Sequence, residues 1–258
     1  MANAIMISGE SGCGKSTSIK YLDPKETFLI SCTNKQPQIP GYRNKYIKMG
    51  KDNLDTANWL VSNSYQVIGK ILNFINIKRQ DIKVIIIDDL NYLLSYSLFD
   101  QALDKGWEKY TIQASDYEEL IRIAQNLRDD LLVVFMSHIE NYGTELEPKW
   151  RLWTSGKMLT SKINLDGLFT YNLYAERELD PETGELIYHF RTRSNGNDTC
   201  RSTAGCFADK YIEPNLKKII DRIKHFEETG EEEVKETTES NPEEDLEMNF
   251  GEIQESNQ

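Results

Sequence analysis

Short apolar runs alternate with longer amphipathic segments along most of the chain. This alternation predicts an α/β fold in which helices cover a mostly parallel sheet. Runs with few polar residues predict buried strands at 4–8, 27–31, 84–87 and 131–137. Two further segments, 168–176 and 186–193, flank a turn sequence at 180–184 and predict an added β-hairpin.

The amphipathic segments between these strands have helical periodicity. They predict helices at 16–22, 56–76, 91–103, 115–129 and 215–228. Because strands and helices alternate without an obvious linker, residues 1–228 are expected to form one domain.

The negative charge of the chain is concentrated at its end. The 258 residues have a formal net charge of −12, and 13 of the 42 acidic residues but only one of the 30 basic residues follow residue 226. Residues 229–258 contain too few apolar groups to offset the entropy of ordering, which predicts a disordered acidic tail. The remaining chain is electrically balanced, so it would not repel a nucleic acid.

A small apolar cluster, 246–250, lies inside this acidic tail. It is either a docking peptide for a replication or recombination protein, or a few incidental apolar groups in a solvated segment.

The sequence from Gly9 to Ser16 is a complete G-x-x-x-x-G-K-[ST] motif between a predicted strand and a predicted helix. Such a loop turns successive backbone N–H groups toward a phosphate, with the helix dipole behind them. Lys15 is expected to reach the β and γ phosphates and Ser16 to bind Mg²⁺. The nucleotide-binding residues are expected to be Gly9, Glu10, Ser11, Gly12, Cys13, Gly14, Lys15, Ser16 and Thr17. The alternative is a glycine-rich turn without a ligand.

Two carboxylates follow the buried strand at 84–87. This is the Walker B pattern, which predicts that Asp88 holds the metal together with Ser16. Asp89 is the first candidate for the general base that activates water. The alternative for both aspartates is capping of the next helix.

The strand at 131–137 ends in Ser137, His138 and, two residues later, Glu140. Polar groups at the carboxyl end of a central strand lie beside the ligand crevice of an open α/β sheet. Ser137 or His138 could sense the γ phosphate, and Glu140 is a second candidate base. The alternative for His138 is a structural role.

The segment at 141–163 has no clear regular structure and interleaves aromatic and basic residues. Bases stack on indoles and phosphates pair with cations, so this segment predicts contact with single-stranded DNA. The DNA-binding candidates are Lys149, Trp150, Arg151, Trp153 and Lys157. A subunit interface, a lid and local core packing are the alternatives.

Cations also gather near the end of the predicted hairpin. Many ring and filament ATPases complete the active site with a cation from a neighbouring subunit. The candidates for this role in trans are Arg191, Arg193, Lys157 and Arg201.

These motifs, with the segments 23–28, 153–159, 166–170 and 212–216, resemble the bacteriophage RecA-like ATP-binding proteins associated with single-strand annealing and recombination. The resemblance covers residues 4–226. It implies a RecA-like P-loop NTPase core that binds ATP with Mg²⁺, forms a homo-oligomeric ring or filament and acts on single-stranded DNA in the host cytoplasm.

One departure from that family concerns catalysis. Recombination-type RecA proteins place a glutamate just after the second strand, and the run from Phe28 to Lys35 contains no acidic residue. Either Asp89 or Glu140 takes this role, or hydrolysis is slow and ATP mainly sets the conformation.

The resulting expectation is an ATPase of DNA recombination. The alternatives are a nucleotide-gated adaptor with little hydrolysis and a P-loop kinase of small molecules. The sequence has no secretory leader, no apolar run long enough to span a membrane, and four cysteines without zinc spacing, which favours a cytoplasmic protein with free thiols.

Overall fold

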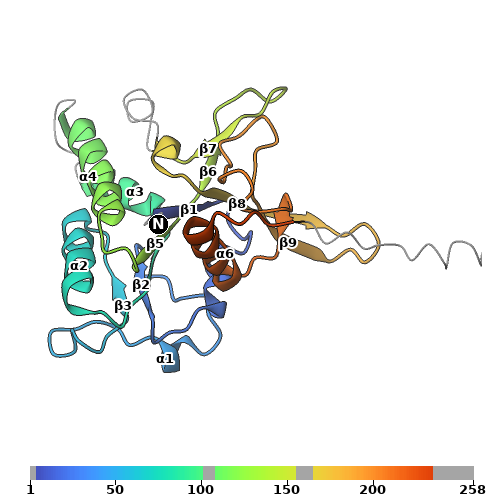
Figure 1. Ribbon diagram of the computed structural model, residues 1–258. Helices are drawn as coiled ribbons and strands as arrows, with labels where there is room; N and C mark the ends of the chain where they lie inside the picture. The colour runs from blue at the N-terminus through green and yellow to red at the C-terminus, as the bar shows by residue number, and fades with distance from the viewer. Residues whose placement is uncertain (1–3, 101–107, 155–164, 235–258) are drawn as a thin grey trace, which may run out of the picture.

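The computed structural model describes residues 4–100, 108–154 and 165–234, and its centre is an eight-stranded sheet (Figure 1). From edge to edge the strands are β10 (Tyr211–Ile212), β9 (Leu186–Arg191), β8 (Asn172–Leu179), β1 (Ala4–Ser8), β5 (Leu132–Ser137), β4 (Val84–Asp88), β2 (Thr27–Ser31) and β3 (Trp59–Val61). The strands from β8 to β3 pair in parallel, whereas β9 and β10 are antiparallel additions. The expected α/β class, mostly parallel sheet and hairpin are therefore confirmed.

Helices cover both faces of this sheet (Figure 1). They are α1 (Tyr42–Lys45), α2 (Tyr65–Lys78), α3 (Asn91–Asp100), α4 (Glu108–Gln125) and α6 (Leu216–Thr229), with the 3₁₀ helices η1 (Ser16–Tyr21) and η2 (Leu165–Leu168). A separate antiparallel ribbon pairs β6 (Ile139–Asn141) with β7 (Trp150–Leu152). None of the described helices is both long and apolar enough to cross a bilayer.

The alternation of side chains along each strand creates two hydrophobic cores. On β4, Ile85 and Ile87 pack in the core beneath α2, α3 and α4, whereas Val84 and Ile86 pack in the core beneath η1 and α6. Strands buried on both faces need such continuous apolar runs. This double burial fixes the register of the central strands, and thereby the position of the polar residues that follow them.

Two predicted helices differ from the structure at their starts. The helix expected over 56–76 is wrong at its beginning, because Trp59–Val61 form β3 beside β2 and α2 starts only after Ser64. Aromatic and β-branched side chains favour that strand, and the Ser64 side chain caps the helix by accepting from the backbone N–H of Val67. The helix α4 already includes Glu108, so its predicted start at 115 is wrong.

Other differences lie in short elements. The segment expected as a helix at 16–22 is the 3₁₀ helix η1, and the segment after β5, expected to be irregular, contains β6 and β7. Strands this short carry too little periodicity to be predicted.

The domain continues past residue 228, where the tail was expected to begin. The helix α6 ends at Thr229, and Gly230 follows with a left-handed φ of 70° that turns the chain back. The backbone N–H of Glu233 then donates to the Gly205 carbonyl, and the Glu233 carboxylate accepts from the N–H of Ala208. The expected tail from 235 to 258, including its apolar cluster at 246–250, lies outside the described residues.

Arg128 holds the end of α2 against the following turn. Its guanidinium donates to the carbonyls of Ile75, Asn76, Arg79 and Ile82. We expect Arg128→Ala to lower the free energy of unfolding by about 2–3 kcal/mol, because it leaves half-buried carbonyls without donors. Urea unfolding measures this change. The control Arg122→Ala removes an exposed arginine and should cost about 0.5 kcal/mol or less; equal losses would show that the Arg128 contacts are not structural.

Candidate functional site

The loop from Gly9 to Lys15 joins β1 to η1 and has the backbone shape of an anion cradle. Gly12 and Gly14 have φ of 79° and 88°, in the left-handed region that side chains disfavour. Among the described residues, the N–H groups of Ser11, Gly12 and Gly14 have no hydrogen-bond acceptor. Unsatisfied backbone donors at the start of a helix are suited to bind phosphate.

Gly9 permits a close approach between the loop and β8. A Cβ atom added at Gly9 would lie 2.3 Å from the Ala175 carbonyl oxygen, a distance that atoms cannot adopt without moving the backbone. The loop therefore rests directly on the strand that leads into the hairpin.

The Lys15 side chain folds back into its own loop. Its Nζ donates to the carbonyls of Gly9 and Glu10, both at 2.7 Å, and lies 3.7 Å from Cys13 Sγ. Burial lowers the pKa of Lys15, although nearby Asp88 and Asp89 oppose this shift. A phosphate in the loop would give this desolvated ammonium group the anionic partner that neutral carbonyls do not supply.

Ser16 and Asp88 meet across the sheet. The Ser16 hydroxyl donates to Asp88 Oδ1 at 3.1 Å, and the same oxygen accepts from the N–H of Asp89 at 3.0 Å. A hydroxyl beside a carboxylate at the end of a parallel strand is the donor set that holds Mg²⁺ on a nucleotide in P-loop proteins. The predicted metal residues are thus adjacent, and they fit a cation that takes its other oxygens from phosphate and water.

The Asp88 carboxyl is electrostatically strained. Burial raises its pKa to about 6, and the neighbouring charge of Asp89 adds to the effect, whereas the Ser16 hydrogen bond opposes it. A bound divalent cation would favour the ionised carboxylate.

Asp89 lies beside Asp88 in an unusual backbone conformation, with φ of 61°. A left-handed aspartate is uncommon, and such residues cluster at functional sites. Its Oδ2 accepts from the Thr33 hydroxyl at 3.3 Å and lies 3.8 Å from Lys35 Nζ, both of which follow β2. The side chain is 8% exposed, so a water held there would be shielded from bulk solvent.

Strand β5 lies between β1 and β4, so its carboxyl end separates the loop from the two aspartates. Ser137 is 1% exposed, and its Oγ has no hydrogen-bond partner among the described residues. His138 Nε2 is 3.8 Å from Asp89 Oδ1. Burial, followed by the charge of Lys15, lowers the pKa of His138, so the imidazole is neutral at pH 7. Both residues lie at the carboxyl end of β5, between the loop and the two aspartates.

Glu140, the second candidate base, lies instead in the β6–β7 ribbon. One carboxylate oxygen accepts from Arg151 Nε at 2.9 Å and from the Thr154 hydroxyl at 3.1 Å. These contacts also occupy Arg151, whose guanidinium lies 4.7 Å from the Tyr142 ring centre. The geometry therefore keeps Asp89 rather than Glu140 as the candidate base.

The DNA-binding candidates lie in different surroundings. Lys149 is exposed, Trp150 is half-buried, and the half-buried Trp153 packs against the core beneath α2 and α4. Lys157 lies outside the described residues. The predicted set is therefore not one continuous basic surface, because Arg151 is paired and Trp153 serves the core.

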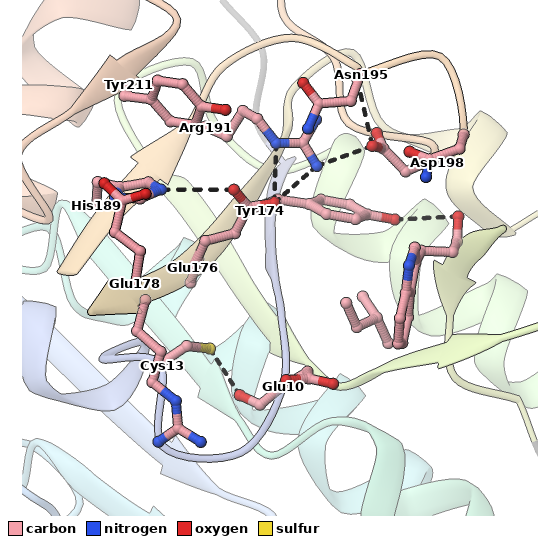
Figure 2. A pocket seen from close by; sticks show the side chains of 15 residues that line it. Glu10, Cys13, Tyr174, Glu176, Glu178, His189, Arg191, Asn195, Asp198 and Tyr211 are labelled. Carbon is pink, nitrogen blue, oxygen red and sulfur yellow. Dashed lines mark hydrogen bonds and ion pairs between the residues drawn. The ribbon is translucent and has the colours of Figure 1, made fainter. Parts of the chain in front are cut away.

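Trp150 lines a cavity of about 370 Å³ above the hairpin (Figure 2). Arg191 is among its lining residues; it is 2% exposed and donates to Glu176 and to Asp198, both at 2.8 Å. The guanidinium also lies 5.2 Å from the Tyr174 ring centre. Arg191 is thus committed to its own chain, which rules it out as a cation for a neighbouring subunit in this conformation.

The remaining candidates for that role differ in access. Arg201 is half-buried and donates to the Asp166 carbonyl. Arg193 is exposed, with one hydrogen bond to the Ala208 carbonyl. Of the described candidates, only Arg193 is exposed.

Four residues near the loop and the aspartates escaped prediction: Thr33, Lys35, Arg177 and Tyr188. Thr33 and Lys35 follow a predicted strand, so their position after β2 was a usable signal. Arg177 and Tyr188 reach the loop only because the hairpin folds over it, and no local pattern predicts that contact.

No protein-family model matches the chain, and no curated protein matches it. Among the described residues, no group of three or more His, Cys, Asp or Glu side chains could hold a metal ion by itself. A site of one hydroxyl and one carboxylate requires oxygens from its ligand to complete the metal shell.

The raised pKa of Asp88 has a testable consequence without ligand. A carboxyl whose pKa is higher in the folded chain than its ordinary value of 3.8 destabilises the fold when ionised, fully above pH 6 and not below pH 3.8. We expect Asp88→Asn to raise the free energy of unfolding by about 1–2 kcal/mol at pH 7.5 in EDTA, and by about half as much at pH 5.

Urea unfolding at the two pH values measures this effect. Asp130→Asn is the control, because its partner Lys83 lowers the pKa of Asp130 and removal of this exposed charge should destabilise slightly. Destabilisation by Asp88→Asn at pH 7.5 would contradict the assigned strain.

Proposed function

We propose that this protein binds ATP with Mg²⁺, hydrolyses it, and acts on single-stranded DNA as a RecA-like recombination or annealing protein. The observation that carries the proposal is the contact between Ser16 and Asp88, which joins a loop of unsatisfied N–H groups to a Walker B strand. The family resemblance of the sequence supports the DNA-directed role and a homo-oligomeric state.

Each residue near the loop has a separate task in this proposal. The N–H groups of Ser11, Gly12 and Gly14 bind phosphate oxygens, and Lys15 exchanges its carbonyl partners for them. Ser16 and Asp88 would hold Mg²⁺, which would supply positive charge next to the phosphates. Asp89 accepts a proton from the attacking water at a carboxylate oxygen.

The same geometry supports coupling between nucleotide and polymer. Strand β6 begins directly after His138, and the carbonyl of His138 accepts from the N–H of Trp153 just beyond β7. A shift of the β5 end in response to a γ phosphate would therefore move the ribbon that carries Lys149 and Trp150.

A second candidate is a nucleotide-gated adaptor with little hydrolysis. Its supporting observation is the environment of Asp89, whose Oδ2 accepts from the Thr33 hydroxyl and lies 3.8 Å from Lys35 Nζ, so these groups compete with an attacking water for this oxygen. ATP would then set the conformation of the ribbon without rapid turnover.

Turnover separates these two candidates. We expect Lys15→Ala to reduce ATP hydrolysis at least about 100-fold, because it removes a preorganised charge from the transferring phosphates. Phosphate release is measured with and without single-stranded DNA, and the exposed Lys25→Ala is the control. DNA-stimulated turnover that is lost only in Lys15→Ala supports the ATPase. Tight ATP binding without turnover in the wild type supports the adaptor.

The polymer contact has its own test. We expect Lys149→Ala to weaken oligonucleotide binding and to reduce the salt dependence of log K by about 0.7, the value for one phosphate contact on a single strand. Trp150→Ala should weaken binding about tenfold with an unchanged salt slope, because stacking carries no charge. Fluorescence anisotropy from 50 to 300 mM salt measures both, with the exposed Lys70→Ala as control. Unchanged affinity in both variants would remove the ribbon from the DNA surface.

A further inference from the structure

The β8–β9 hairpin turns one of its faces onto the phosphate loop. Arg177 and Tyr188 are directly opposite each other in the antiparallel register, so their side chains share this face. Arg177 Nη1 lies 3.4 Å from the Gly12 carbonyl oxygen. The Tyr188 ring lies 3.4 Å from the point where a Cβ atom of Gly14 would be. The hairpin thus covers Gly12 and Gly14, both of which have left-handed φ.

This face is fixed rather than incidental. The close contact between Gly9 and the Ala175 carbonyl holds β8 against the loop two residues before Arg177. Parallel pairing of β1 with β8 continues this contact into the sheet. The position of Arg177 relative to the loop is therefore set by backbone packing.

Arg177 also differs from the other arginine that the hairpin contributes to this region. Arg191 is buried between two carboxylates, whereas Arg177 is exposed and no described carboxylate forms an ion pair with it. Its one hydrogen bond is long and goes to a neutral carbonyl. The loop thus has a cation beside it whose charge is available for a ligand.

A cavity of about 400 Å³ adjoins the same face of the hairpin. It is lined by Gly12, Gly14, Thr17, Ser18, Lys20, Tyr21, Gln38, Tyr188 and Pro214. The cavity lies at the end of the loop where η1 begins, and it does not include Asp88 or Asp89. A triphosphate with its γ group near Lys15 and Asp88 would direct its nucleoside away from the aspartates, toward this cavity.

We propose that the β8–β9 hairpin closes the nucleotide site within the same chain, with Tyr188 stacking on the nucleobase and Arg177 contributing charge to the phosphates. This inference rests on the proposed function, because it assigns the nucleoside end and one cation of the same site. Tyr188 and Tyr21 both line the cavity and are 40% and 39% exposed, so two aromatic side chains are partly accessible to a base. The Gln38 amide supplies a donor and an acceptor for its polar edge.

Tyr188 and Arg177 act on different parts of the ligand, so two ligands that differ only in the nucleoside can separate their contributions. The probes are ATP and inorganic tripolyphosphate, each titrated calorimetrically with Mg²⁺ into the full chain. We expect Tyr188→Ala to lower the affinity for ATP about tenfold and to leave the affinity for tripolyphosphate unchanged, because only ATP has a base to stack. Tyr188→Phe should retain the affinity for ATP. Arg177→Gln should lower the affinity for both ligands about tenfold, because both contain the phosphates.

The matched controls are Tyr211→Ala, an exposed tyrosine of the adjoining strand β10, and Arg122→Gln on α4. Both should bind as the wild type does. The assignment of Tyr188 is overturned if its alanine variant binds ATP with the wild-type affinity, or if its affinities for ATP and for tripolyphosphate fall equally. The assignment of Arg177 is overturned if its glutamine variant binds both normally.

The wild-type chain separates the proposed ATP site from the role of the hairpin. A wild-type chain that binds neither ligand removes the proposed ATP site and this inference with it. A wild-type chain that binds ATP while all hairpin variants match it retains the loop site and removes only the hairpin from it.

Discussion

The hydrogen bond between the Ser16 hydroxyl and Asp88 Oδ1 is the contact on which the candidate site depends. The two residues are 72 positions apart in the chain. Ser16 begins η1, after the loop that follows β1, and Asp88 ends β4, a strand that is not a neighbour of β1 in the sheet. They meet because β1, β5 and β4 are parallel and in a register fixed by burial on both faces. A slip of either strand by one residue would move each of its side chains to the opposite face of the sheet. It would also separate Ser16, at the end of the loop, from the Asp88 carboxylate.

The central strands and the glycine-rich turn between β1 and η1 were predictable because each is specified locally. The run before Asp88 is apolar without interruption, and the glycines and lysine of the loop have a spacing that few other functions require. The start of α2 was not predictable, because the three residues Trp59–Val61 are too few to show a strand period and adopt a strand by pairing with β2. Tertiary contact overrides periodicity in segments of this length.

The candidate site residues also divide into those that local sequence places and those that distant contacts place. The sequence placed Asp88 and Ser137 correctly at strand ends, since position after a buried strand is a local property. It could not separate Arg191 from Arg177, because nothing in the sequence distinguishes a buried cation from an exposed one. Arg191 meets Glu176 across the hairpin and Asp198 from a loop, whereas Arg177 faces glycine backbone. Partners far along the chain decide which arginine is available.

Without a ligand, the site buries the charged groups of Lys15 and Asp88 at a cost in free energy. Burial lowers the pKa of Lys15 and raises that of Asp88, so each charged form is disfavoured before any ligand enters. A magnesium–triphosphate complex would reverse both conditions, because its phosphates favour the ammonium and its metal favours the carboxylate. Part of the affinity for that ligand would therefore come from relief of strain already present in the fold.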